Sequence, residues 1–173
     1  SYWTGLPSEY KIVEAADAFT QDKYLKAGKS SKTYVKVIDV EAGADLYAAV
    51  SIRGTKGSKS FVGITSDLNG KNFILNNDNE VASKFYYTKE DGEWQRVGIR
   101  FFAPSSGKVA LVINTQDGAL DVDNVMIFKS TYNFHYDPND YFKYVPYDYS
   151  DMSNVIINGG KGEQPYYTGD LTV

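Results

Sequence analysis

Hydrophobic and polar residues alternate with a period of two along the middle of this chain, and a helical period is almost absent. The apolar side chains fall on one face of each alternating segment, whereas residues such as Tyr47 and Arg53 fall on the other. Strict alternation of this kind is typical of half-buried antiparallel strands. The pattern predicts strands over residues 34–41, 46–53, 60–66, 71–76, 81–88, 93–103, 108–116 and 121–129.

Turn-forming residues separate these segments. Glycine with Asp, Asn or Ser stands between almost every pair of predicted strands, as in "DLNGK", "KEDGE" and "TQDGA". Eight short strands with such turns predict an all-β fold, an antiparallel β-sandwich of the jelly-roll kind. The pattern of residues 8–29 fits either a short helix or a strand with a loop.

The C-terminal part of the chain has a different character. Residues 131–153 are rich in Tyr and Asp without clean periodicity, which predicts a long loop or an irregular wrap following a sandwich over 1–130. Residues 166–169 (Tyr-Tyr-Thr-Gly) repeat residues 2–5 (Tyr-Trp-Thr-Gly) except for one ring. We expect a strand over 154–160, within a segment 154–173 that closes this sandwich or opens a following repeat. A chance match in a Tyr-rich chain is the alternative.

The composition of the chain argues against several classes of function. The 173 residues carry a net charge of −4, so the basic footprint that nucleic-acid binding needs is missing. The longest apolar run, residues 109–113, is far too short to span a bilayer, and membrane insertion is not expected. The chain has no Cys, which removes disulfides and thiolate metal sites. The 15 Tyr, 9 Phe and 2 Trp indicate a strand-rich structure or a contact surface.

Residues 92–129 carry motifs that resemble a known group of proteins. They contain a Gly-x-Trp strand, an "FFAP" exit, a strand of alternating aliphatics after Gly107 and a final "DVDNV" strand. Together with residues 34–54, this segment is similar to jelly-roll carbohydrate-binding modules, the group that includes xylan and β-glucan binders. The resemblance implies a polysaccharide ligand. Residues 1–33 depart from the group, because they lack its usual first strand.

Catalysis has little support in the sequence. The single His135 excludes centres built from several His residues. Glycoside hydrolysis needs two carboxylates that face one sugar, and most acidic residues here fall in turns. Asp121 and Asp123 are the one pair that a predicted strand would place inward at alternate positions. In the resembling modules an Asp of the last strand often helps to hold a structural calcium, an ion that prefers oxygen ligands, which makes Asp123 the candidate metal ligand and a calcium ion the one expected cofactor. A solvated strand end is the alternative.

Sugar binding suits the remaining residues better. A sugar presents apolar C–H faces and a rim of hydroxyl groups, so a site for it combines flat rings with amides, carboxylates or guanidinium groups. Polar strand faces supply such groups, and the loops supply rings. Trp3 can equally anchor the N-terminal segment, and the Tyr residues of 132–149 can simply cover a sheet edge. The predicted ligand-binding residues are Trp3, Tyr47, Arg53, Arg96, Asn114, Gln116, Tyr132 and Tyr136.

We therefore expect a noncatalytic module that binds plant glucan, xylan or starch through stacked rings and polar side chains. We expect it to belong to a secreted or cell-surface bacterial protein and to be linked to other domains, since the chain begins with Ser rather than Met. Two alternatives are a protein-interaction or stalk module and a small jelly-roll glycosidase.

Overall fold

The computed structural model describes residues 3–17, 23–75, 80–129, 155–157 and 160–161. Within these ranges the chain forms strands and no helix, and the strands build two antiparallel sheets, which confirms the all-β sandwich. The strands are β1 (Tyr10–Glu14), β2 (Lys23–Ala27), β3 (Tyr34–Asp39), β4 (Asp45–Arg53), β5 (Phe61–Thr65), β6 (Ala82–Tyr86), β7 (Gln95–Phe102), β8 (Lys108–Asn114), β9 (Leu120–Lys129), β10 (Val155–Ile157) and β11 (Gly160–Lys161).

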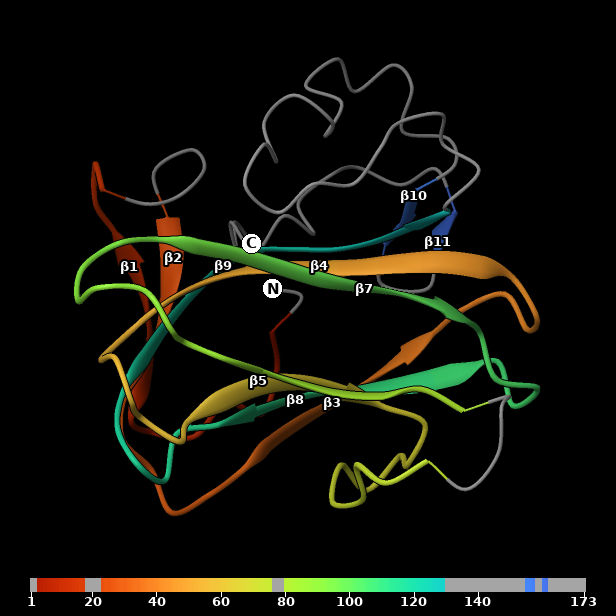
Figure 1. The fold of residues 1–173 in the computed structure, drawn as a ribbon, viewed down its shortest axis with the longest axis horizontal. Helices are drawn as coiled ribbons and strands as arrows, with labels where there is room; N and C mark the ends of the chain where they lie inside the picture. Colours follow the sequence, from red (N-terminus) through yellow and green to blue (C-terminus); the bar gives the residue numbers. More distant parts are fainter. Residues whose placement is uncertain (1–2, 18–22, 76–79, 130–154, 158–159, 162–173) are drawn as a thin grey trace.

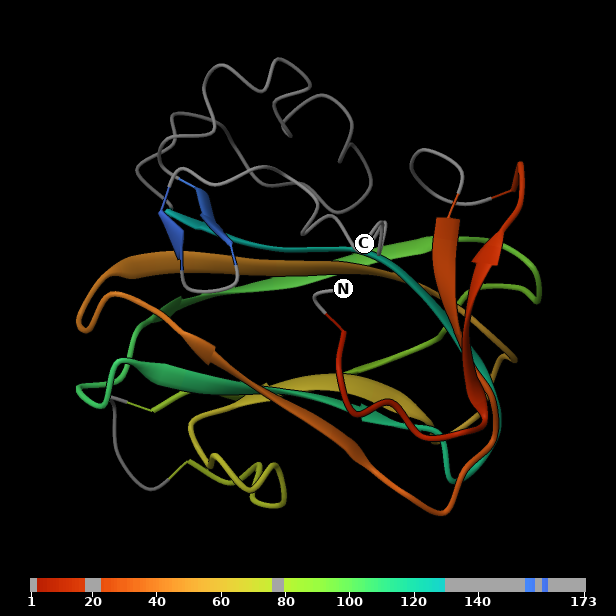
Figure 2. The same cartoon turned by 180° about the vertical axis from the view of Figure 1, so that it is seen from behind.

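The two sheets lie face to face as two layers (Figure 1). Sheet A contains β1, β2, β9, β4 and β7 together with β10 and β11. Its long strand β9 pairs with β4 along one side, and with β2 and then β10 along the other. Sheet B has the order β3-β8-β5-β6. Figure 2 shows the N-terminal segment running between the two layers before it reaches β1.

The alternation read from the sequence decides which side chains form the core. Leu46 and Ile52 of β4 are completely buried between the sheets, as are Val109 and Ile113 of β8. The residues of β8 that alternate with these, such as Asn114, face the outside of the sandwich. Each strand therefore contributes one face to the core and one to an outer surface, as predicted.

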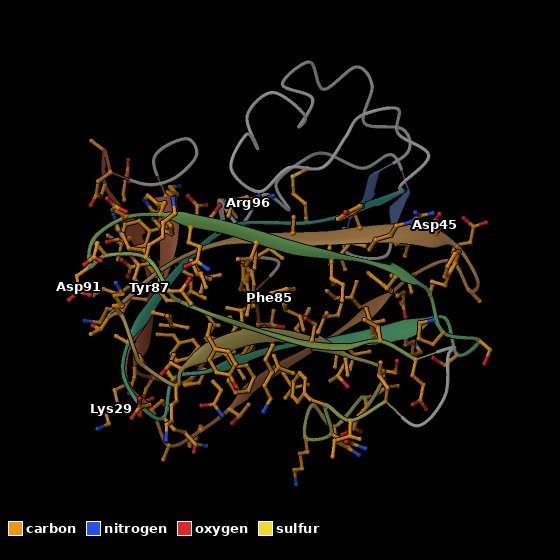
Figure 3. All side chains as sticks on the ribbon, in the orientation of Figure 1. Lys29, Asp45, Phe85, Tyr87, Asp91 and Arg96 are labelled. Atoms are coloured by element: carbon orange, nitrogen blue, oxygen red, sulfur yellow. The ribbon has the colours of Figure 1, made fainter. Side chains whose placement is uncertain are left out.

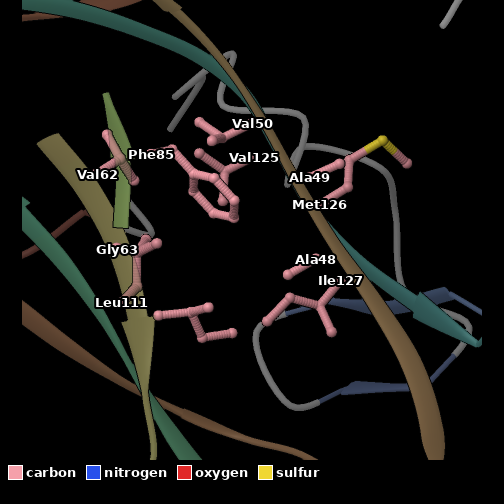
Figure 4. A pocket seen from close by; sticks show the side chains of 11 residues that line it. Ala48, Ala49, Val50, Val62, Gly63, Phe85, Leu111, Val125, Met126 and Ile127 are labelled. Atoms are coloured by element: carbon pink, nitrogen blue, oxygen red, sulfur yellow. The ribbon is translucent and has the colours of Figure 1, made fainter. Parts of the chain in front are cut away.

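A bulge in β9 shifts this alternation by one residue. Ala49 of β4 lies opposite Met126, but Ser51 lies opposite Asp123, so β9 contains an extra residue between these pairs. As a result Val122 and Val125 both point inward. Figure 4 shows Val125 pointing toward sheet B, whereas Met126 points away from it. The bulge keeps both halves of this long strand in the core.

The two layers pack almost without voids. The space drawn in Figure 4 is a cavity of about 20 Å³ between the sheets, where Phe85 and Leu111 of sheet B face Val50 and Ile127 of sheet A. Its lining is apolar, and an apolar cavity of about one water volume stays dry. The cavity is a packing defect in the core and has no features of a ligand site.

Three parts of the chain add to or differ from the sequence expectations. Residues 8–29, left open between helix and strand, contain the antiparallel hairpin of β1 and β2. Residues 71–75, expected to be a strand, form part of a loop that folds over sheet B instead. Of the strand expected over 154–160, residues 155–157 form β10, which pairs with β9 of this sandwich, whereas Gly160 belongs to the separate strand β11. The division of the chain at residues 130 and 153 stays a prediction.

Candidate functional site

A groove of about 510 Å³ lies on the outer face of sheet B, within the size range of small-ligand sites. The strands β3, β8, β5 and β6 form its floor, and the loop of residues 66–75 forms one wall. Figure 1 shows this loop below sheet B, on the side that faces away from sheet A. The described residues that line the groove are Thr33, Val35, Phe61, Asn69, Gly70, Lys71, Phe73, Lys84 and Asn114.

Strand register brings an aromatic and an amide side by side on the floor. Phe61 of β5 lies opposite Asn114 of β8 on one side and opposite Tyr86 of β6 on the other. Side chains at paired positions point to the same face of a sheet. The row therefore runs from the phenol of Tyr86 across the Phe61 ring to the amide of Asn114.

Three aromatic rings form a cluster along this row. The Phe61 ring meets the Phe73 ring edge-on, with 5.5 Å between centres, and the Tyr86 ring at 5.8 Å. Such tilted pairs are favourable arrangements for aromatic rings. Phe61 is buried beneath its neighbours, whereas Tyr86 is 42% exposed and Phe73 is half-buried. Tyr86 and Phe73 are therefore the rings that a ligand can reach.

A glycine on β5 makes room for the ring of Phe73. A Cβ atom on Gly63 would lie 2.6 Å from Cε1 of Phe73 and 3.0 Å from the carbonyl oxygen of Ser83. Real Cβ contacts are not that short, so any side chain at residue 63 would displace the Phe73 ring. The absence of a side chain at Gly63 is what lets the loop lie flat on the sheet.

The carboxylate of Asp67 organises the loop. Its Oδ1 atom accepts a hydrogen bond from the backbone N–H of Asn69 at 3.1 Å, and Oδ2 accepts from Lys71 at 3.0 Å and Asn72 at 2.8 Å. These backbone hydrogen bonds hold the pKa of the Asp67 carboxyl below its ordinary value. The carboxylate thus fixes the backbone that carries Lys71 and Phe73.

Two further contacts attach the loop to the sheet. The hydroxyl of Thr65, on β5, donates a 2.6 Å hydrogen bond to the carbonyl of Asn72. Gly70 has a φ of +70° and packs so closely on Val35 and Val112 that a Cβ atom would lie 2.7 Å from a Val35 methyl group. Both the left-handed backbone and the close approach need glycine here. The loop wall is therefore built into the fold.

Two cations border the groove. The Nζ atom of Lys84 lies 4.7 Å from the centre of the Phe61 ring and 5.0 Å from that of Phe73, which is cation–π distance for both rings. Lys71 lies in the loop that forms the wall. Among the described residues that line the groove, none carries a carboxylate.

The amide N–H groups at the other end of the groove make only weak hydrogen bonds, whereas the Oδ1 atom of Asn114 accepts a 3.1 Å hydrogen bond from the backbone N–H of Gln116. The Nδ2 atom of Asn114 donates to the Thr33 hydroxyl at 3.5 Å, and the Nε2 atom of Gln116 reaches the same hydroxyl at 3.5 Å. These distances lie at the outer limit for hydrogen bonds, so exchanging them for bonds to a ligand costs little. Of the predicted ligand-binding residues, Asn114 belongs to the described lining of this groove, and Gln116 lies beside it, next to Thr33.

The other predicted strand residues lie on the opposite outer face of the sandwich. Tyr47 and Arg96 belong to the outer face of sheet A, where Tyr47 is paired with Arg100 and Arg96 with Ser51. Figure 3 shows Arg96 on this sheet, toward the opposite end from Asp45. Two packed sheets are separated by about 10 Å of core, so residues of both outer faces cannot hold one small ligand. The predicted set therefore divides into two groups.

Arg53 is held by other residues of the protein. Its Nε atom donates to Asp121 at 2.8 Å, and its Nη1 atom donates to Asp17 at 3.0 Å. The guanidinium also lies 4.3 Å from the centre of the Trp94 ring. These contacts join β4 to β9 and to the end of the β1 hairpin, so we assign Arg53 a structural role.

Trp3 does not face a ligand. It is 4% exposed and packs in the core, with its ring 5.9 Å from that of Tyr34. The sequence suggested that Trp3 either stacks on a ligand or anchors the N-terminal segment. Its buried position between the sheets allows only the anchoring role. Tyr132 and Tyr136 lie outside the described residues.

Asp123, the candidate calcium ligand, is completely buried on the outer side of β9. It lies opposite Ser51, whose hydroxyl oxygen accepts a 3.2 Å hydrogen bond from the Nη1 atom of Arg96. Calcium takes six to eight oxygen ligands. Within the part of the chain that the structure describes, no three His, Asp or Glu side chains gather as a metal site, and a calcium ion stays a prediction.

Across the residues with a described structure, no helix is long and apolar enough to cross a bilayer. The comparison with family models gave no match, and neither did the comparison with curated proteins.

Several solved structures resemble this fold. A family 61 carbohydrate-binding module, TmCBM61 in complex with β-1,4-galactotriose, has a TM-score of 0.47 and 19% identity over 70% of this chain and 83% of that one. The xylan-binding domain CBM22-1 of Paenibacillus barcinonensis Xyn10C has a TM-score of 0.43 and 15% identity over 70% and 81%. An adhesin domain of Lys-gingipain from Porphyromonas gingivalis has a TM-score of 0.41 and 12% identity over 75% and 96%.

Carbohydrate-binding modules are thus among the structures that this chain resembles, as the motifs of residues 34–129 predicted. All three TM-scores are below 0.5 and all identities are below 25%, so these likenesses carry no argument about ligand or site. Ligand and site are inferred from the groove's own residues.

Proposed function

We propose that this chain is a noncatalytic polysaccharide-binding module and that the groove on sheet B holds the glycan. The observation that carries the proposal is the row formed by Tyr86, Phe61 and Asn114, with the Phe73 ring beside it. Rings that a ligand can reach lie at one end of this row, and an amide whose N–H group makes only a weak internal hydrogen bond lies at the other.

The chemistry of a sugar chain matches this arrangement. The C–H face of a pyranose ring loses water favourably when it packs on an aromatic ring, and its hydroxyl groups need donors and acceptors at the side. Phe73 and Tyr86 supply the ring surface, and Asn114 supplies a planar amide that can donate and accept at once. The strands and the anchored loop hold these groups in place before a ligand arrives, which lowers the entropy cost of binding.

The same groove offers little for hydrolysis. A glycosidase places two carboxyl groups on either side of the scissile bond. The described lining of the groove contains two Lys, amides, hydroxyls and rings, but no carboxyl group. Holding a glycan is what these side chains can do, so the proposal is a binding function.

The context of the module belongs to the proposal as well. Plant glucan, xylan and starch are the ligand classes that we expect, and such polymers are met outside the cell. We therefore propose a secreted or cell-surface bacterial protein in which this module is linked to other domains. Its partner would be the polysaccharide.

One observation favours the protein-interaction alternative. Ile74 is 75% exposed and Leu75 is 52% exposed, on the loop next to the groove. Aliphatic side chains pair poorly with sugar hydroxyls and are typical of protein contact surfaces. A partner protein that covers Ile74 would bind without the rings of the groove, so the Ile74→Ser variant separates the two functions. It would abolish a protein contact and leave glycan binding intact.

The proposal is tested by affinity electrophoresis through gels that contain one polysaccharide each: xylan, mixed-linkage glucan, galactan, mannan, starch and polygalacturonate. The expected result is slower migration on at least one polymer, without release of reducing sugar from it. Unchanged migration on all of them would contradict a polysaccharide-binding function.

A further inference from the structure

The groove also carries a charge that a neutral sugar would not use. We propose that it selects polysaccharides that bear an anionic group, a uronate carboxylate in the first place, over their neutral counterparts. This inference deepens the proposed function and rests on it. The inference specifies the charge of the preferred glycan, which the ring cluster alone does not determine.

Lys84 is the residue that carries the selection. Its Nζ atom lies within 5.0 Å of the centres of both the Phe61 and the Phe73 rings, directly over the surface on which a sugar would pack. The side chain comes from β6, opposite Gly63, so no neighbouring side chain on β5 separates the ammonium group from the rings. Lys84 also lines the groove, so its ammonium group lies beside the Phe73 ring on which a sugar would pack.

Lys71, in the loop that forms the wall, adds a second cation to the groove. The loop that carries it is fixed by the carboxylate of Asp67, whose oxygens already accept three backbone hydrogen bonds. That carboxylate is therefore occupied within its own loop. The described lining thus contains two ammonium groups and no carboxylate, although acidic residues outnumber basic ones by 22 to 18 in the whole chain.

This arrangement suits a sugar acid. A uronate has the same apolar C–H face as a neutral pyranose, together with a carboxylate at its edge. With the face on Phe73 or Tyr86, the carboxylate can accept charge-assisted hydrogen bonds from Lys84 and Lys71, which are about twice as strong as neutral ones. A neutral sugar offers the two ammonium groups only uncharged hydroxyl oxygens, which make weaker hydrogen bonds than a carboxylate does. A sulfate ester offers the same anionic chemistry from a different source.

The test compares ligands that differ only in charge. Affinity electrophoresis or calorimetry with the full chain would use polygalacturonate and its methyl ester, which has the same sugars without the charge. Dextran sulfate and dextran form the second pair. We expect binding to polygalacturonate to be about tenfold tighter than binding to its ester, as one charged hydrogen bond implies. Tight binding to dextran sulfate alone would support an anionic ligand with sulfate as its source.

Variants connect this preference to the groove. Lys84→Gln should reduce the preference for polygalacturonate over the ester about tenfold, whereas Lys84→Arg should keep most of it. Lys11→Gln is the matched control, because Lys11 is an exposed lysine on β1 of the other sheet. Circular dichroism confirms that each variant is folded.

The outcomes separate the inference from the proposed function. Equal binding of charged and neutral polymers, or a preference that Lys84→Gln leaves unchanged, would overturn the charge selection and keep polysaccharide binding. No binding to any polymer of the panel would overturn both.

Discussion

The Nζ atom of Lys84 lies 4.7 Å from the centre of the Phe61 ring, on the outer face of sheet B. This contact places a cation and an aromatic surface at the same point, where β6 and β5 pair. It depends on the loop of residues 66–75, which brings Phe73 to the same spot. The proposed site is thus formed by one sheet and the loop that lies on it.

The fit of Phe73 against Gly63 gives the first prediction. Gly63→Ala places a Cβ atom where Cε1 of Phe73 lies, so we expect the ring to shift, the protein to lose about 1–3 kcal/mol of unfolding free energy and glycan affinity to fall. Urea denaturation and calorimetry measure the two effects. In the Gly63→Ala, Phe73→Ala double variant the clash is gone, so the double variant should lose less stability than the two single changes added together. Additive losses would contradict the proposed packing.

Acid should loosen the loop through Asp67. Its folded pKa is lower than the ordinary value of 3.8, so its stabilisation is present above that value and is lost as the pH falls through the lower folded pKa. We expect the protection factors of the amides at residues 69–72 to fall in that acid range, with weaker glycan binding. Asp67→Asn has one acceptor oxygen in place of two and should show faster exchange at neutral pH as well. An identical acid response in the Asn variant would assign the effect to another group.

Arg53 provides a prediction about stability alone. Its ion pairs with Asp121 and Asp17 are largely shielded from solvent at Arg53, so Arg53→Ala leaves the half-buried Asp121 carboxylate without its cation. We expect a loss of about 3 kcal/mol in unfolding free energy and unchanged glycan affinity. Arg100→Ala is the matched control, because it removes an exposed pair with Asp45 and should leave the unfolding free energy nearly unchanged. Weaker glycan binding by the Arg53→Ala variant would show that Arg53 belongs to the ligand-binding site.

Alternation along the chain predicted the sheets well, for a physical reason. Residues such as Leu46 and Ile113 must be buried, and a period of two places every second residue on the same face, so the faces of β4 and β8 could be read directly. Alternation does not reveal which sheet a strand joins. Asn114 and Tyr47 were therefore predicted for one site, although they lie on opposite outer faces.

The main residues of the groove were missed because their role depends on contacts between distant segments. Phe73 was predicted as part of a strand, since "KNFILN" is a short segment with an apolar centre between the turn signals "DLNGK" and "NNDN". The hydrogen bonds of Asp67 and Thr65 hold it in a loop instead. One signal was present in the sequence: Phe61 and Thr65 share a strand face with Gly63, and a glycine within a strand marks a close approach by another part of the chain.

The central claim is that the glycan binds on sheet B, and two matched double variants test it most directly. Phe73→Ala with Tyr86→Ala removes one Phe and one Tyr from the groove, and Phe102→Ala with Tyr47→Ala removes the same two rings from the outer face of sheet A. Each ring that covers about 40 Å² of a sugar contributes about 1 kcal/mol, or about fivefold in affinity. We expect calorimetry with the best-retained polysaccharide to show at least about a tenfold loss for the first pair and less than about a twofold loss for the second. The reverse result would place the binding surface on sheet A and contradict this account.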